Sequence, residues 1–298
     1  MDTSFIHGVV PPVITPVDAE ERVEERGLRR VVEHVIAGGV HGILSLGSNG
    51  EFFGFDRAEQ QRALAITLDQ ARGRVPVYFG IGAITTRECV AQVRIAEEEK
   101  AQAITMLPPM FLAPNENELF DHFRAVAEAT DLPVLLYNNP GRVGHGLSAR
   151  LVARLAGVPN IVGAKDTSGN MSLTADYIRL TRHAGFKVMA GKDTMILPSL
   201  VCGAVGCIAS TANIVPRLVV EIYDKFCQGD LAGALEAQFK LTPLRNAFDL
   251  ASFPVVTKDA ANLIGLDVGA PILPNRGSPE PVLQQLRAIL DELGVLKK

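Results

Sequence analysis

Eight short apolar runs recur along the chain, and each is bounded by glycine, proline or polar residues. Most of these runs are continuous rather than alternating, which is typical of strands covered on both faces, as in a parallel sheet. The runs cover residues 8–14, 42–46, 75–81, 103–107, 133–137, 161–165, 187–190 and 206–209. The pattern therefore predicts eight parallel strands.

Amphipathic stretches separate these runs. Leu28, Val31 and Val35 mark one apolar face at helical spacing, and residues 63–68 and 151–155 show the same periodicity. Strands that alternate with helices over about 215 residues are typical of a (β/α)8 barrel, the TIM barrel. A nucleotide-binding doubly wound sheet would carry a glycine-rich turn after its first strand. The first run here ends without glycine, which disfavours a nicotinamide-dependent dehydrogenase.

The chain beyond the eighth run has helical periodicity and no clear strand. We predict an α/β fold in which residues 1–228 form the (β/α)8 TIM barrel. Residues 229–298 then form a C-terminal helical extension that packs on the barrel.

Composition narrows the class of partner. The 298 residues are 47% hydrophobic and 21% charged, which excludes disordered and disulfide-dense proteins. The formal net charge is -4, so no basic surface for nucleic acid is expected. Aromatic residues make up 6% and tryptophan is absent, so platforms for base stacking are poorly supplied. We expect a small-molecule ligand and no nucleic acid.

The sequence also predicts a cytoplasmic protein without a metal or cofactor. Residues 1–12 lack a basic, apolar signal segment. The uncharged stretch 194–216 is interrupted by glycine and proline, so we predict a buried helix and then a buried strand rather than a membrane span. Four cysteines without a CxxC pair are interpreted as buried thiols in a reducing compartment, and six scattered histidines show no ligand spacing.

Lys165 is the most informative polar residue, because it ends the otherwise apolar run 161–165. A free lysine has a pKa near 10.4, so only about one in a thousand is neutral at pH 7. Burial lowers that pKa and makes the amine a nucleophile that can form a Schiff base. The alternative is a structural lysine paired with Asp166 or a loop carboxylate, and from spacing alone both remain open.

Other strand ends carry further candidates. Tyr137 ends the fifth run and is either a barrel-mouth residue with its hydroxyl in water or a proton shuttle for Lys165. The small residues 47–50 form either a plain turn or a nest of N–H groups that holds a carboxylate. Glu51 is interpreted as an acid at a helix N-terminus. Arg142 is either an exposed loop residue or a clamp for a substrate carboxylate.

Two polar residues near these strand ends are given structural interpretations. Asp193 follows the seventh run and is predicted to be an N-cap. His145, close to Arg142 in the sequence, is either a residue of the barrel mouth or, as we favour, a solvent-facing loop residue.

Together the motifs resemble the dihydrodipicolinate synthase / N-acetylneuraminate lyase family. The resemblance rests on GSNGE at 47–51, YNNPGR at 137–142 and GAKDTSG at 163–169, with VVPPVITPV at 9–17 and GAVGCIASTANIVP at 203–216. It covers nearly the whole chain, in the family's order. It implies a TIM barrel, a homotetramer, and metal-free Schiff-base catalysis on pyruvate or another 2-oxo acid.

The resemblance also implies roles for individual residues. Lys165 forms the imine and Tyr137 is the acid and base. Ser48 and Asn49 hold the carboxylate of the 2-oxo acid. Ile208 offers a backbone carbonyl near the adduct.

The members of this family differ in the reaction that they catalyse, and the motifs of this chain point to more than one of them. Synthases have two threonines where this chain has Ser48 and Asn49, and a tyrosine pair after the fourth strand, where residues 107–111 read LPPMF without a phenol. Arg142, in contrast, matches the arginine that synthases use for the semialdehyde carboxylate. Residues 166–168 and the motif GSNGEF resemble 4-hydroxy-2-oxoglutarate aldolases and sugar-acid aldolases or dehydratases.

We therefore expect a Schiff-base lyase or aldolase that converts a 2-oxo acid to pyruvate and an aldehyde. The runner-up is 4-hydroxy-tetrahydrodipicolinate synthase, which condenses pyruvate with aspartate semialdehyde, and a 2-keto-3-deoxy sugar-acid dehydratase is a further alternative. A pyruvate-binding regulatory barrel is the non-enzymatic alternative. Lys165 and Tyr137 argue against it, because binding alone needs neither.

Overall fold

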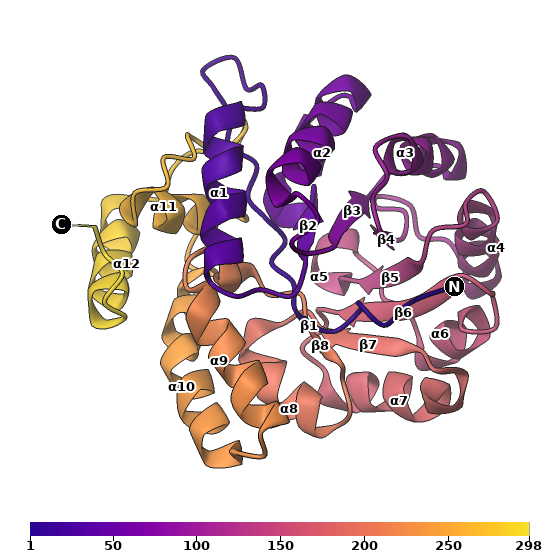
Figure 1. Ribbon diagram of the computed structural model, residues 1–298. Helices are drawn as coiled ribbons and strands as arrows, with labels where there is room; N and C mark the ends of the chain where they lie inside the picture. The colour runs from indigo at the N-terminus through magenta and orange to yellow at the C-terminus, as the bar shows by residue number, and fades with distance from the viewer. Residues whose placement is uncertain (298) are drawn as a thin grey trace.

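All eight apolar runs form strands in the computed structural model, which describes residues 1–297 (Figure 1). The strands are β1 (Gly8–Val9), β2 (Ile43–Ser45), β3 (Val77–Ile81), β4 (Ala103–Met106), β5 (Val134–Asn138), β6 (Ile161–Asp166), β7 (Lys187–Ala190) and β8 (Gly206–Cys207). The first is much shorter than its apolar run, because Pro11 and Pro12 have no N–H to continue a ladder.

The strands are parallel and follow the order β1-β8-β7-β6-β5-β4-β3-β2. A parallel bridge between Pro12 and Leu44 joins the segment after β1 to β2 and completes the ring. Between β1 and β8, a Cβ at Gly206 would lie 2.1 Å from the carbonyl oxygen of Gly8, so only glycine permits this pairing. The predicted (β/α)8 TIM barrel is confirmed.

Helices surround the barrel (Figure 1). They are α1 (Glu25–Ala37), α2 (Arg57–Ala71), α3 (Thr86–Glu98), α4 (Glu116–Ala127), α5 (Pro140–Val143), α6 (Ala149–Leu155), α7 (Met171–Thr181), α8 (Ile196–Val201) and α9 (Pro216–Cys227). The C-terminal extension forms α10 (Leu231–Ala247), α11 (Val255–Leu263) and α12 (Glu280–Glu292). Figure 1 shows α11 and α12, in yellow, beside α1 on the outside of the ring.

Side chains fix where several helices begin. Asp56 caps α2 by accepting the N–H of Glu59. At α4, Asn115 and Glu118 form a reciprocal capping box. The predicted helix and strand within residues 194–216 are α8 and β8. In the described part of the chain, no helix has both the length and the apolar character that crossing a bilayer requires.

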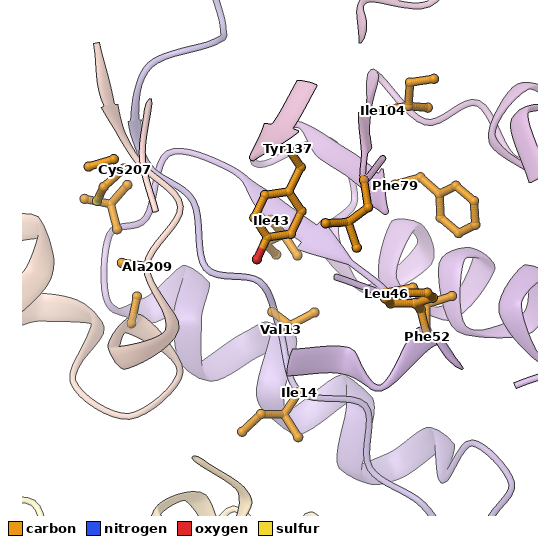
Figure 2. Packing of buried hydrophobic residues seen from close by; sticks show 14 of the residues in the cluster. Val13, Ile14, Ile43, Leu46, Phe52, Phe79, Ile104, Tyr137, Cys207 and Ala209 are labelled. Carbon is orange, nitrogen blue, oxygen red and sulfur yellow. The ribbon is translucent and has the colours of Figure 1, made fainter. Parts of the chain in front are cut away.

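Two clusters of buried side chains make up the core. The larger one packs the strands against the helices, and Figure 2 shows part of it near Tyr137. The smaller one takes residues from β2, β3, β4, β5 and β7 and from positions beside β1 and β8, and so fills the barrel interior. Its buried members are Ile6, Val10, Leu44, Tyr78, Ala103, Leu135, Met189 and Ile208. The filled interior leaves only the strand ends for chemistry.

Two sequence interpretations are wrong. Cys89 and Cys207 are buried, but Cys202 and Cys227 are exposed, because both lie at the ends of outer helices. All four thiols are free. Asp193 is not an N-cap. Its Oδ2 accepts hydrogen bonds from the backbone N and the Oγ1 of Thr211, both at 2.7 Å, and so ties the end of β7 to the end of β8.

Candidate active site

Lys165 and Tyr137 lie side by side because β5 and β6 pair in register at these two residues. Both are almost fully buried, at 3% and 5% exposure. The Lys165 Nζ lies 4.0 Å from the centroid of the Tyr137 ring. Figure 2 shows the tyrosine hydroxyl directed away from its strand. The strand ends thus present a buried amine and a buried phenol to one another.

Lys165 does not form the ion pair with Asp166 that was the structural alternative. The carboxylate of Asp166 is occupied by other groups: Asn138 donates to it at 2.9 Å and Thr174 at 2.6 Å. Ser168 donates both its backbone N–H and its hydroxyl, each at 3.0 Å. Within residues 1–297 no ion pair includes Lys165. The lysine is therefore buried without a carboxylate partner.

The environment also changes the acidity of Tyr137. Burial by itself raises the pKa of a phenol. Here the positive charge of Lys165, with hydrogen bonding from Ser48, Lys165 and Thr167, outweighs burial, and the pKa of Tyr137 falls below its ordinary value. Asn139 donates a further hydrogen bond to the hydroxyl at 2.9 Å. A phenol with a lowered pKa gives up its proton more readily, as a proton shuttle must.

Ser48 and Asn49 lie in the short 3-10 turn η1 (Ser48–Gly50) that follows β2. Both are buried, and Asn49 Nδ2 donates to Ser210 Oγ at 2.8 Å. The N–H groups of Gly50 and Glu51 close the turn onto the carbonyls of Gly47 and Ser48. The turn is therefore closed by hydrogen bonds and places two small polar residues next to Tyr137 and Lys165.

Glu51 behaves differently from the expected helix-terminal acid. It adopts φ +53 between η1 and η2 (Phe52–Gly54), and its side chain makes no capping bond to either turn. Instead Oε2 lies 2.5 Å from Nζ of Lys258 in α11, and both side chains have 0% exposure. Oε1 accepts the N–H of Ile272 at 2.9 Å, and Lys258 donates to the carbonyl of Ala270 at 2.8 Å. Burial, the largest effect, lowers the pKa of Lys258, and Glu51 opposes it.

A cavity of about 400 Å³ opens above the lysine. The strand ends and their loops contribute Asn49, Tyr137, Asn139, Arg142, Lys165, Thr167, Gly191, Lys192 and Ser210. The C-terminal extension contributes Arg245, Phe248, Asp249 and Phe253. Arg142, in α5, is exposed and rests its guanidinium 4.5 Å above the ring of Phe253. The cavity thus brings the predicted Lys165, Tyr137, Asn49 and Arg142 together.

Ile208 is fully buried, and its side chain belongs to the interior cluster. The role of its backbone carbonyl near the adduct stays a prediction. His145 is half-buried rather than fully solvent-facing, with its Nε2 2.9 Å from the carbonyl of Pro109, and it does not line the cavity. The sequence did not predict that Arg245, Asp249 and Phe253 line the cavity. These residues belong to the C-terminal extension, which has no strand end to indicate a position near the site. Within residues 1–297, no group of three or more potential metal ligands is present.

Comparison with known proteins agrees with this geometry. The model of the dihydrodipicolinate synthetase family matches residues 5–293. A 4-hydroxy-tetrahydrodipicolinate synthase of Methanospirillum hungatei is 36% identical over 288 residues, 96% of this chain and 99% of that protein.

Two solved structures are also similar to this chain. The dihydrodipicolinate synthase of Thermotoga maritima superposes with a TM-score of 0.95 at 29% identity, covering 98% of this chain and 100% of that one. The dihydrodipicolinate synthase of Acinetobacter baumannii, solved in complex with pyruvate, gives a TM-score of 0.94 at 30% identity, covering 98% of this chain and 100% of that one.

Fold, site and relatives together define an enzyme, a lyase of the class I aldolase type built on a TIM barrel. Such enzymes bind a carbonyl substrate through a lysine Schiff base. The chain belongs to the dihydrodipicolinate synthetase family.

Proposed function

We propose that the protein is a Schiff-base lyase that cleaves or forms a C–C bond of a 2-oxo acid, with pyruvate and an aldehyde on the other side of the reaction. The observation that carries this proposal is Lys165: an amine at 3% exposure, without a carboxylate partner among residues 1–297, 4.0 Å from the ring of Tyr137 in the lining of a cavity. A lysine in such surroundings is suited to covalent catalysis.

In the cleavage direction, the neutral amine of Lys165 adds to the C2 carbonyl of a 4-hydroxy-2-oxo acid. Tyr137 moves protons as the carbinolamine loses water and becomes the protonated imine. The imine accepts the electron pair of the C3–C4 bond, the C4 hydroxyl loses its proton, and an aldehyde leaves. The remaining enamine is protonated at C3 and hydrolysed, which releases pyruvate and the free amine.

Two further contacts orient the substrate in this proposal. The turn of Ser48 and Asn49 holds the C1 carboxylate, because small polar residues and backbone N–H groups suit an anion. Arg142 faces the cavity from α5 and can clamp a distal carboxylate with two parallel hydrogen bonds. Ile208 supplies a carbonyl near the adduct.

The second candidate is 4-hydroxy-tetrahydrodipicolinate synthase, the name given to the Methanospirillum hungatei relative. Arg142 in the cavity favours it, since the semialdehyde carries a carboxylate. The missing phenol in residues 107–111 and the Ser48-Asn49 pair favour the aldolase. A 2-keto-3-deoxy sugar-acid dehydratase would use the same imine and lose a hydroxyl instead of an aldehyde. A pyruvate-binding regulatory barrel is disfavoured, since it would need neither the buried amine nor the phenol.

We further propose a homotetramer located in the cytoplasm. An apolar surface next to the site supports assembly, because Phe111 is 91% exposed and Leu112 46% exposed in the loop after β4. Analytical ultracentrifugation tests this proposal directly. A monomer at micromolar concentration would contradict it.

The proposed chemistry is tested by trapping. Incubation with pyruvate and borohydride should reduce the imine and add a pyruvate-derived mass to the peptide that contains Lys165. The Lys165→Ala variant should give no adduct, and an undiminished adduct would reject the assignment. Pyruvate release from a panel of 4-hydroxy-2-oxo acids, run beside condensation with aspartate semialdehyde, separates aldolase from synthase.

A further inference from the structure

The wall that the C-terminal extension supplies to the cavity carries cations that the proposed mechanism does not use. Arg245, near the end of α10, and Lys192, just after β7, both face Asp249. Asp249 Oδ2 lies 3.0 Å from Arg245 Nη1 and 3.3 Å from Lys192 Nζ. The Arg245 side chain is 14% exposed and that of Lys192 29%, whereas Asp249 is 55% exposed. The two cations are thus held in place by one solvent-facing carboxylate.

The charge of the lining is unbalanced. Its only acidic residue is Asp249, and its cations are Arg142, Lys165, Lys192 and Arg245. Arg142 has no ion pair within residues 1–297. Leaving Lys165 aside, three cations face a single carboxylate, so the lining carries an excess of positive charge.

We propose that Lys192 and Arg245, together with Arg142, form a distal carboxylate subsite, and that the substrate of this enzyme is therefore a 2-oxo diacid. The inference rests on the proposed function, which places the C1 carboxylate and the carbonyl at Lys165. Asp249 keeps the two cations oriented in the free enzyme and moves into solvent when the terminal carboxylate of the substrate takes its position. Phe248 and Phe253 line the same cavity and contact the carbon chain between the two ends.

Other tails fit this wall less well. A neutral polyol tail would leave the excess charge uncompensated in a partly buried site, which costs free energy. A carboxylate tail fits, because Asp249 already shows that Lys192 and Arg245 accept a carboxylate between them.

The test compares two probes of equal length that differ only at the tail. 2-Oxoglutarate ends in a carboxylate and 2-oxopentanoate ends in a methyl group. Each competes with pyruvate for borohydride trapping on Lys165, and mass spectrometry measures the concentration that halves the pyruvate-derived adduct. A charge-assisted hydrogen bond predicts that wild type prefers 2-oxoglutarate by roughly tenfold or more.

The variants Lys192→Met and Arg245→Gln should each reduce this preference by about threefold or more, as expected for loss of one ionic contact. Arg287→Gln is the matched control, because it breaks an exposed ion pair with Glu280 in the same C-terminal extension and should keep the wild-type preference. If Arg245→Gln does not fold, Lys192→Met still tests the subsite. Lys192 lies on a partly exposed loop, so this variant should fold.

The outcomes separate the two proposals. Absence of any pyruvate adduct in wild type overturns the Schiff-base function itself. A normal adduct with equal competition by both probes overturns only the distal subsite. A preference for 2-oxoglutarate that survives both variants also overturns it, and assigns the tail to Arg142 alone.

Discussion

Replacing Lys258 with methionine should destabilise the protein more than replacement of any surface lysine. The substitution preserves much of the side-chain volume but leaves the Glu51 carboxylate without its cation, at 0% exposure and with one remaining hydrogen bond from Ile272. Removing one partner of a buried ion pair typically costs about 3–5 kcal/mol. In a chain of this length, a loss of that much unfolding free energy lowers the melting temperature by on the order of 10 °C.

Thermal unfolding followed by circular dichroism at pH 7 measures the effect. Lys225→Met is the matched control, because it breaks an ion pair with Glu221 of the same 2.5 Å length at the surface, and its melting temperature should barely change. The double variant Glu51→Gln with Lys258→Met should recover part of the loss, since no buried charge remains. The pyruvate concentration for half-maximal trapping should rise in Lys258→Met, because Glu51 closes the turn of Ser48 and Asn49. Equal melting temperatures for Lys258→Met and Lys225→Met would refute the reasoning.

Four further outcomes are expected. Tyr137→Phe should lower kcat about 100-fold or more through loss of proton transfer, and an unchanged kcat in a pyruvate-release assay would remove the phenol from the mechanism. Arg142→Ala should lower kcat/KM for a diacid by roughly 10–150-fold more than for a neutral-tailed substrate; equal losses would contradict a recognition role. Exhaustive chelation with EDTA should leave activity intact, whereas a loss restored by a divalent ion would favour metal-enolate chemistry. Burial lowers the pKa of His122 from 6.5 to about 4, so the free energy of unfolding should fall as the pH drops through that window. Urea titrations of His122→Gln between pH 7 and pH 4 should show a flatter profile, and a parallel profile would count against this origin.

The barrel could be predicted from the sequence because its strands leave an unusually direct signal. A strand covered on both faces must be apolar throughout, so each run is visible without alignment, and only β1 and β8 are much shorter than expected. Lys165 and Tyr137 stood out for the same reason, as polar residues ending apolar runs. The parallel register then brought them together.

The remaining parts of the site depend on contacts across the length of the chain. Glu51 and Lys258 are separated by most of the sequence, and neither has a local pattern that shows its partner. Arg245 and Asp249 look like ordinary helix-end charges until α10 is placed over the cavity. The division of the chain at residue 228 stays a prediction, as do the roles assigned to Ser48, Asn49 and Ile208.

The contribution of the C-terminal extension to the cavity has a consequence for how such an enzyme can change over generations. The groups that we propose to form and break the imine are fixed by strand register, whereas Arg245, Phe248, Asp249 and Phe253 lie within a few residues of one another at the end of one helix and the loop beyond it. Mutations in that short segment can redirect the enzyme to a new aldehyde while the bond-making apparatus is inherited unaltered. Selection can therefore act on substrate preference and on reactivity almost independently.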